Sequence, residues 1–360
     1  MSEESSKKIT KWLYITCGII MVLVVFGGYV RLTRSGLSIV EWNPISGVMP
    51  PIGAEAWQVE FTKYQQSPEF QKLNSSMTLA GYKKIFYVEF IHRQIARFAG
   101  LGVVVPLFYW LFKGVIPWRK SASYLLIGLL FGVQGYMGWY MVQSGLIDNP
   151  AISHYRLAAH LLTALLLLAL TLWMILHHTR GFAQLNRKSM RSHPFWLSVS
   201  LTAVLIIQIT YGAFMAGLKA GYVSHTFPLM YGQLVPAGLL SFVNPWWRNL
   251  ISAPPTVHFI HRWFGFMVLF VAIYLFWVAK RRNYGVEIQR NALTMVGLVC
   301  VQILLGVSVI WFSVPTWLAL LHQGTALFLF ITAVNLNYQF SHLPVPESGN
   351  VATQLNPTTA

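Results

Sequence analysis

Long apolar stretches alternate with short polar segments along the whole chain. Eight windows of about 20 predominantly apolar residues, the length that crosses the hydrocarbon core of a bilayer, can be read from the sequence. They lie at residues 12–30, 85–112, 122–142, 154–176, 195–217, 256–279, 292–312 and 316–339. The pattern predicts an all-α integral membrane protein with eight transmembrane helices.

The composition agrees with this interpretation. Hydrophobic residues make up 55% of the 360 residues and charged residues 10%, and the mean hydropathy of +0.54 lies far outside the balance of a soluble domain. The net charge of +16 would suit nucleic acid, but the basic residues gather in short loops on one side. This bias is typical of cytoplasmic loops. We therefore expect the protein to contact membrane lipid and not nucleic acid.

The distribution of charge also predicts the topology. With the N-terminus inside, fourteen of the 26 basic residues fall on the cytoplasmic side, namely Lys7, Lys8, Lys11, Lys113, Arg119, Lys120, Arg180, Arg187, Lys188, Arg191, Lys280, Arg281, Arg282 and Arg290. Residues 1–11 contain two glutamates and no cleavage signature, which fits neither a cleaved signal nor a transit peptide. We expect a multi-pass protein of the bacterial inner (cell) membrane with both termini in the cytoplasm.

The two halves of the chain repeat each other. The tetrapeptide Phe-Ile-His-Arg occurs around His92 and again around His261, 169 residues later, and His160 precedes His322 by 162 residues. Self-similarity at such a period indicates two copies of one helical unit. We expect a cytoplasmic N-terminus at 1–11, a first four-helix bundle at 12–179, a cytoplasmic linker at 180–194, a second four-helix bundle at 195–340 and a cytoplasmic tail at 341–360.

Small and polar residues recur at fixed spacing inside three of the predicted helices. A glutamine precedes a glycine by four positions at Gln134 and Gly138, Gln208 and Gly212, and Gln302 and Gly306. This pattern indicates a close helix crossing with a buried hydrogen-bonding amide, and we interpret it as packing. Such faces are also compatible with an oligomer, although no residue is assigned to an interface. The two cysteines, Cys17 and Cys300, both fall inside apolar spans, where packing is their expected role.

Two outer loops, 31–83 and 218–255, are unusually long, and loops of this size are normally functional. The first contains Trp42, Trp57, Phe61, Tyr64 and Phe70 among polar residues. We expect this loop to fold as short helices on the outer membrane face.

Four histidines occupy equivalent depths in the even-numbered spans, at His92, His160, His261 and His322. These spans start on the outer side, which places the histidines roughly 7–12 Å below the outer surface. An ionisable residue in hydrocarbon costs a few kcal/mol, so four at one level indicate a metal or haem site rather than four unrelated core groups. Zinc is disfavoured because no carboxylate or thiolate completes a tetrahedral set in the second repeat. Neutral imidazole suits iron, and two imidazoles are what a hexacoordinate haem needs. The sequence predicts two haem pockets near the outer side, one from His92 and His160 and one from His261 and His322.

Cations and one carboxyl group accompany the histidines. Four arginines lie next to them or about a helical turn away, at Arg93, Arg97, Arg156 and Arg262. Their guanidinium groups suit haem propionates, and the alternative is snorkelling towards lipid phosphates.

The two repeats differ at one position close to the histidines. Glu89 shares a helix face with His92, whereas the matching residue of the second repeat is His258. A carboxyl group beside only one of two similar pockets suggests that the pockets have different roles. Glu89 is a candidate proton acceptor, and the alternative is an ion-pair partner for the neighbouring arginines.

Motifs distributed over nearly the whole chain resemble the haem A synthase family of bacteria and mitochondria. They are residues 28–38, Glu41-Trp42-Asn43-Pro44, Pro50-Pro51, Met77-Thr78-Leu79, Glu89-Phe90-Ile91-His92-Arg93, residues 155–160, 211–217 and 227–230, His261-Arg262 and His322-Gln323. Some relatives carry a cysteine pair in the first outer loop. This chain has none there and is similar to the branch without it.

The resemblance implies a membrane-bound oxidoreductase that oxidises a methyl group of haem O to a formyl group through a hydroxymethyl intermediate, yielding haem A for terminal oxidases. It assigns the substrate haem O to His92 and His160 and a resident haem b to His261 and His322. From its position beside His92, we hypothesise that Glu89 is a further catalytic residue that acts as a general base. The implied partners are haem O synthase (protohaem farnesyltransferase) and an electron-transfer partner.

Two other functions are compatible with paired histidines in duplicated helices. One is a bis-histidine transmembrane cytochrome b that only carries electrons, and the other is a transporter. Two haems near one face argue against a conduit across the bilayer, which needs a haem near each surface.

Overall fold

The computed structural model describes residues 3–43, 46–147, 150–180 and 185–343. Within these ranges it contains eight helices long and apolar enough to cross a membrane, and each coincides with one of the eight predicted spans. They are α1 (Glu3–Leu32), α4 (Leu79–Phe112), α5 (Ala122–Gln143), α6 (His154–Thr179), α7 (His193–Gly217), α9 (Pro254–Arg281), α10 (Val286–Trp311) and α11 (Thr316–Ser341). No extended strand occurs in the described ranges. The predicted all-α membrane fold is confirmed.

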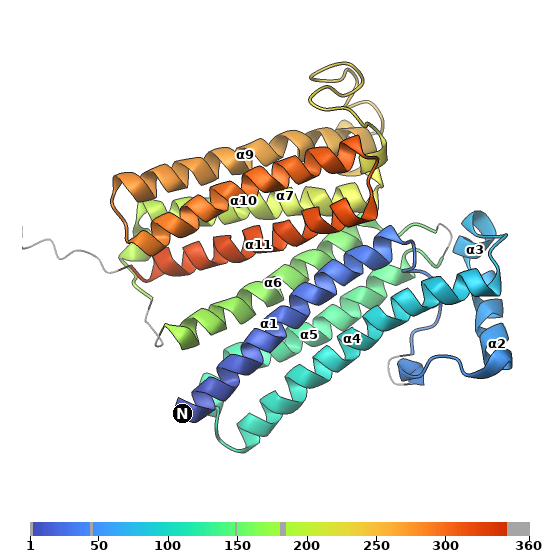
Figure 1. The fold of residues 1–360 in the computed structure, drawn as a ribbon, viewed down its shortest axis with the longest axis horizontal. Coiled ribbons are helices and arrows are strands. Elements are labelled where there is room, and N and C mark those ends of the chain that lie inside the picture. The colour runs from blue at the N-terminus through green and yellow to red at the C-terminus, as the bar shows by residue number, and fades with distance from the viewer. Residues whose placement is uncertain (1–2, 44–45, 148–149, 181–184, 344–360) are drawn as a thin grey trace, which may run out of the picture.

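The helices form two groups of four (Figure 1). In the first unit, α1 and α5 each contact both α4 and α6, and in the second, α7 and α10 each contact both α9 and α11. The units meet where α1 and α6 of the first contact α7 and α11 of the second. This arrangement is consistent with the predicted duplication. The linker and the tail are described only in part, because residues 181–184 and 344–360 lie outside the described ranges.

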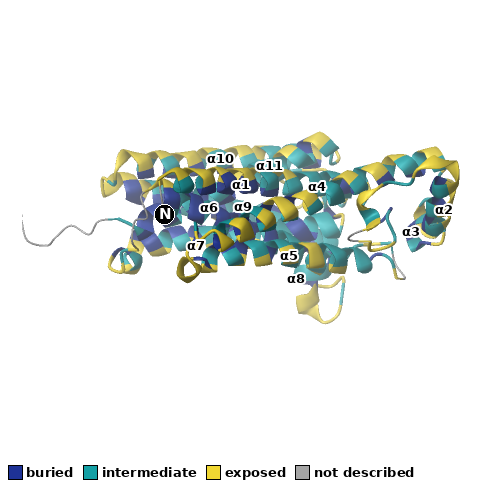
Figure 2. Ribbon diagram, turned by 90° about the horizontal axis from the view of Figure 1, so that it is seen from below, coloured by how far each residue is buried: buried dark blue, intermediate teal, exposed yellow. Residues whose placement is uncertain are grey.

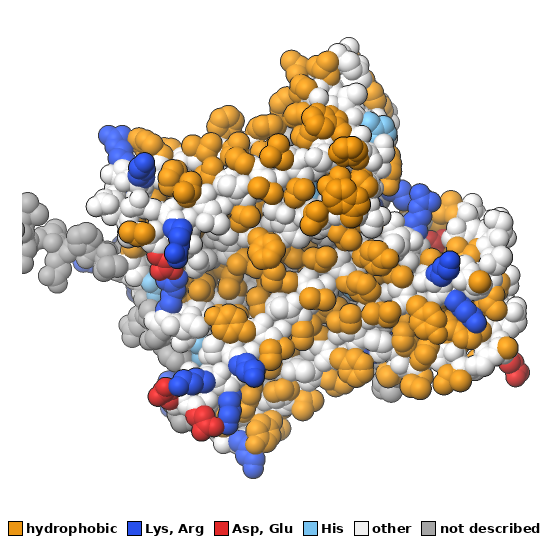
Figure 3. All heavy atoms as spheres, viewed as in Figure 1, with side chains coloured by type: hydrophobic (Ala, Val, Ile, Leu, Met, Phe, Trp, Pro, Cys, Tyr) orange, Lys and Arg blue, Asp and Glu red, His pale blue; other side chains and the backbone are white. Residues whose placement is uncertain are grey.

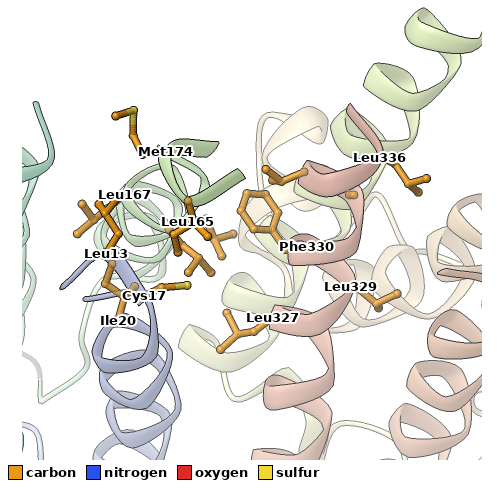
Figure 4. Close-up of a cluster of buried hydrophobic side chains, with 14 of the residues drawn as sticks. Leu13, Cys17, Ile20, Leu165, Leu167, Met174, Leu327, Leu329, Phe330 and Leu336 are labelled. Carbon is orange, nitrogen blue, oxygen red and sulfur yellow. The ribbon is translucent and has the colours of Figure 1, made fainter. Parts of the chain in front are cut away.

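The interior is densest where the two units meet. Figure 4 shows Leu13 and Cys17 of α1, Leu165 of α6, and Leu327 and Phe330 of α11, all members of one buried cluster. In the most apolar windows of α6 and α11, 33% of the residues are buried, against 11% for α5. Helices α6 and α11 are therefore central, whereas α5 has few fully buried residues.

The outward faces of the helices are apolar. Exposed side chains include Phe98 and Leu101 of α4, Phe270 of α9 and Leu304 of α10. Figure 2 shows exposed residues along the outward faces of the helices, and Figure 3 shows apolar side chains forming a band between two ends that carry Lys and Arg. A soluble protein rarely exposes contiguous apolar patches of this extent. The band matches the region that lipid would cover.

Helix boundaries differ from the predicted spans where polar segments extend a helix. Helix α1 begins at Glu3 rather than at residue 12, with ion pairs of 2.7 Å from Lys7 to Glu3 and from Lys8 to Glu4. Such i,i+4 pairs support a helix beyond its apolar part. The expected cytoplasmic N-terminus is therefore largely a helical extension of the first span.

The first outer loop folds into the short helices that the sequence predicts, namely η1 (Ser46–Val48), α2 (Gly53–Gln65) and α3 (Pro68–Leu73). Trp57, Phe61 and Tyr64 of α2 form a buried aromatic cluster with Tyr82 and Phe86 of α4. We call η1, α2, α3 and the first two turns of α4 the outer subdomain, and "outer" names the end of the molecule that the charge pattern predicts to face away from the cytoplasm. It lies at the outer end of α4 (Figure 1).

Helix α4 begins at Leu79, six residues before the predicted start at 85. Thr78 caps it by accepting a hydrogen bond from the Gly81 amide, and Tyr82 is fully buried in the aromatic cluster. The predicted span covered only the apolar part of α4, whereas the helix continues into the outer subdomain. His92 consequently lies thirteen residues into α4, while His160, His261 and His322 lie six or seven residues into their helices.

The second outer loop contains only short elements. They are η4 (Ala220–Tyr222), η5 (Trp246–Arg248) and α8 (Asn249–Ser252), and the opposite end has η2 (Trp118–Lys120) and η3 (Ser189–Arg191). The buried Asn249 amide donates to the carbonyls of Leu240, Val243 and Trp246 at 2.7–2.9 Å. One side chain thus organises much of this loop, which projects from the outer end of α9 (Figure 1).

Candidate functional site

Each of the four histidines faces a glycine on a neighbouring helix. A methyl group built on the glycine would lie 3.3 Å from His92 at Gly27, 3.6 Å from His160 at Gly138, 3.3 Å from His261 at Gly212 and 3.0 Å from His322 at Gly306. A side chain at the tightest of these positions would displace the imidazole, because real Cβ contacts are rarely so short. The glycines create the space that the rings occupy.

The sequence-predicted histidines of the second unit are close neighbours. The ring centres of His261 and His322 lie 6.3 Å apart, and their planes are inclined by 77°. Two metal–imidazole bonds of about 2 Å each would take up about 4 Å of this separation. The remaining distance is close to the sum of the two distances from a ring centre to its coordinating nitrogen. The spacing therefore fits one metal ion held between two imidazoles.

The histidines of the first unit are also neighbours. His160 is near enough to His92 for the two imidazoles to interact electrostatically. His92 Nε2 lies 3.3 Å from the carbonyl oxygen of Leu23 in α1, and the ring stacks on Phe26 with centres 5.9 Å apart. The first pair is thus held by α1 and α4 on one side and by α6 on the other.

Several imidazole nitrogens lack the partner that a buried polar atom normally has. The Nδ1 atoms of His160, His261 and His322 are buried and make no hydrogen bond with any described residue. Buried polar atoms are almost always satisfied, and an orphan points to a missing ligand or water. Within the described ranges, no group of three or more His, Cys, Asp or Glu side chains is arranged to hold a metal ion. Paired imidazoles and an apolar shell fit a haem better than a zinc ion.

The three glutamines that the sequence analysis assigned to packing contact the histidine-bearing segments. Gln134 and Gln208 donate to the backbone carbonyls of His160 and His261, at 3.2 and 2.9 Å. Gln302 instead lies 3.3 Å from His322 Nε2. The glutamine therefore supports the helix in two cases and the ring itself in one.

Glu89 is surrounded by hydrogen-bond donors. Arg93 donates to Oε1 from Nη2 at 2.5 Å and from Nε at 3.0 Å. The backbone amides of Ser38 and Ile39 and the Ser38 hydroxyl donate to Oε2 at 2.7–3.0 Å. A carboxylate has about four lone-pair sites, so this one is saturated. Glu89 pairs with an arginine, as one of the two sequence interpretations holds, and also ties the segment after α1 to α4.

The matching position of the second unit carries a different pair. His258 is fully buried, and its Nε2 lies 3.1 Å from Arg262 Nη2. Arg262 also donates to the carbonyl of Leu229 at 3.1 Å. An arginine thus attaches an outer segment to the histidine-bearing helix in both units, but the group beside it is acidic only in the first.

The other two arginines also contact outer segments. Arg97 donates to the carbonyl of Asn43 at 2.9 Å, and Arg156 donates to that of Tyr140 at 2.8 Å while lying over the Tyr140 ring at 3.8 Å. All four predicted propionate-binding arginines therefore hold backbone carbonyls at the outer end. Their predicted contact with a haem remains a prediction.

Comparison with known proteins identifies the family of the chain. A family model described as cytochrome oxidase assembly protein matches residues 10–334. Proteins named Heme A synthase are 38% identical to the chain in Ehrlichia ruminantium (strain Gardel), 39% in Nitrosospira multiformis and 36% in Rickettsia bellii (strain RML369-C). The alignments cover 93%, 92% and 91% of this chain and 94%, 93% and 97% of those proteins. The chain belongs to the haem A synthase family. The matched range, residues 10–334, spans the positions of all four histidines and of the outer subdomain.

The pairing of each histidine with a glycine is not visible in the sequence. Gly27 precedes His92 by 65 residues, whereas Gly306 precedes His322 by only 16. No common spacing connects the partners, because the loops between the helices differ in length. The available signal was the recurrence of glycine at one level in successive odd-numbered spans.

Proposed function

We propose that the protein converts haem O into haem A, with His92 and His160 holding the substrate and His261 and His322 holding a resident haem b. The observation that carries the proposal is the pair of similar histidine sites, each facing glycines, in a member of the haem A synthase family. Haem takes part in the reaction as substrate, and the enzyme is an oxidoreductase of haem A biosynthesis.

The two sites receive different roles because their surroundings differ. Only the first pair has a carboxylate on the same helix face, at Glu89. In the second unit the buried His258 occupies the matching position, and the ring centres of His261 and His322 lie 6.3 Å apart. A site that retains its ligand needs firm attachment, whereas a site that transforms its ligand needs a group that accepts a proton.

The protein contributes position, exclusion of water and proton transfer. A bound iron porphyrin supplies the redox chemistry. The imidazoles orient the macrocycle, and the apolar faces of the helices keep water from its plane. Converting a methyl to a formyl group is a four-electron oxidation that adds one oxygen atom. When that atom comes from water, four protons are released and an electron-transfer partner accepts the four electrons. We further propose haem O synthase as the partner that supplies the substrate.

Glu89 is proposed as the proton acceptor. Its Oε2 holds three donors from Ser38 and Ile39, so accepting a proton requires the release of one of them. The neighbouring Arg93 stabilises the carboxylate before the transfer. This requirement links the proton step to the segment that follows α1.

The charge distribution supports one topology. Most Lys and Arg residues belong to the end of the molecule that holds the start of α1 and the ends of α4, α6 and α9. Under the positive-inside rule this end is cytoplasmic. We propose a bacterial inner membrane, cytoplasmic termini and haem sites towards the periplasm.

Mass analysis of extracted haem tests the proposal against the electron-carrier alternative. Protein purified from cells that make haem O is expected to yield haem A or its hydroxylated precursor together with haem b. Haem b alone, from protein that was supplied with haem O and an electron acceptor, would instead support the cytochrome b function. The near-full-length relatives named Heme A synthase favour the first outcome.

A further inference from the structure

Three cations lie together at the outer end, where the two units meet. Arg31 belongs to the last turn of α1, Arg34 follows it, and Lys219 follows α7. Lys219 interacts electrostatically with both arginines, and burial together with these two positive charges lowers the pKa of Lys219. Like charges that are held together destabilise a fold unless an anion joins them.

None of these three side chains has an anionic partner within the described ranges. Their side chains form no ion pair and no hydrogen bond with a described residue. Glu69 interacts electrostatically with Lys219 and Arg34, but it is itself buried and receives a hydrogen bond from the Tyr64 hydroxyl. Burial raises the pKa of Glu69 to about 7, so it balances the cations only in part. In contrast, Arg93 is paired with Glu89.

Arg31 lies directly outward of the histidine level. It follows Gly27 by four residues and Gly28 by three, so the three residues share a helix face. Gly27 faces His92, and Gly28 packs against Gln323, the neighbour of His322. Side chains of a helix lean towards its N-terminus, which directs Arg31 back towards the imidazoles.

We propose that Arg31, assisted by Lys219, binds the carboxylate groups of the iron porphyrin that His92 and His160 hold. This inference rests on the proposed function. A guanidinium group presents its donors as a planar fork that matches a carboxylate, and an ammonium group adds a second positive charge. The site combines a cation of the first unit with one of the second, so carboxylate binding connects the two units above the substrate pocket.

A porphyrin without carboxylates provides the test. Apoprotein carrying His322→Ala, which leaves only the first histidine pair intact, is titrated with iron protoporphyrin IX and with its dimethyl ester while the Soret band is recorded. We expect the free acid to bind at least about tenfold more tightly than the ester, since a charged hydrogen-bonded pair stabilises by about 1.5–3 kcal/mol. Arg31→Gln should remove most of this preference, Lys219→Gln a smaller part, and Arg31→Lys should retain some of it.

Matched controls are available on the same side of the molecule. Arg248 and Lys84 are exposed outer cations, and Arg248→Gln and Lys84→Gln should leave the acid-to-ester ratio unchanged. The proposal is overturned if Arg31→Gln weakens acid and ester equally, which would indicate a structural role. It is also overturned if the preference responds to Arg31 only in a His160→Ala background, because the carboxylates would then belong to the second pocket. If neither porphyrin binds at either histidine pair, the proposed haem sites themselves are wrong.

Discussion

The two four-helix units place their histidines in similar helix packing, but the segments at their outer ends differ. In the first unit, the folded outer subdomain lies over the end of α4, and Glu89 ties the segment at Ser38 to the same helix. In the second, a loop of short elements is attached through Arg262 and Asn249. Helix packing is therefore common to both units, whereas the outer cover and the acidic group distinguish them. Two units with similar helix packing can thus carry loops of different structure.

The largest expected effects come from removing the histidines one unit at a time. His261→Ala or His322→Ala should lower the resident haem content by about tenfold or more, because loss of an axial ligand leaves a haem weakly held. His92→Ala or His160→Ala should abolish haem A formation while resident haem remains. Both quantities are measured as haem per protein after extraction. His193→Ala, an exposed histidine at the opposite end, serves as control, and equal haem loss in both sets would remove the distinction between the units.

Substitution of Glu89 tests whether this carboxyl group explains the proposed difference between the two units. Glu89→Gln should reduce haem A yield by about 10²-fold or more without changing resident haem content. Ser38→Ala removes one donor to the carboxylate but keeps the acid, so its yield should stay within a few fold of wild type. Wild-type yield from Glu89→Gln with normal haem binding would exclude a proton-transfer role and leave only the attachment of the segment at Ser38.

The glycine positions test the shared frame. Gly306→Ala places a methyl group 3.0 Å from His322, whereas Gly297→Ala in the same helix meets no atom within 4 Å. Overpacking by one methyl costs about 1–3 kcal/mol, so we expect resident haem to bind roughly 5–150-fold more weakly in the first variant and normally in the second. In the first unit, Gly27→Ala and Gly18→Ala form the corresponding pair. Identical haem affinities within each pair would contradict the proposed role of the glycines.

The smallest expected effect concerns the outer subdomain. Burial raises the pKa of Glu69 from 4.5 to about 7, so the folded state binds this proton more tightly than the unfolded chain does. Stability from this group is fully present below about pH 4.5 and is lost as the pH rises through 7. Glu69→Gln should make hydrogen-exchange protection of α2 and α3 less dependent on pH, whereas the exposed Glu55→Gln should not. A protection factor that rises from pH 5 to pH 8 in wild type would contradict this sign.

Much of the helical fold can be predicted from the sequence alone. Apolar windows predict all eight membrane helices, because a bilayer requires about 20 apolar residues whatever the neighbouring helices do. The boundaries of α1 and α4 were less predictable, since polar ion pairs and the aromatic cluster around Tyr82 extend these helices beyond the apolar windows. The histidine positions were visible because a buried ionisable group is rare in a membrane helix.

Sequence by itself determined the number of spans, the clustering of basic residues and the positions of the four histidines, because each depends on residue type and on spacing within a segment. Only the tertiary structure decided that every histidine faces a glycine, that Glu89 is saturated by Ser38, Ile39 and Arg93, and that Arg31 and Lys219 lie together. Those relations join residues separated by loops of unequal length. Their distances depend on how the helices pack, which no local pattern encodes.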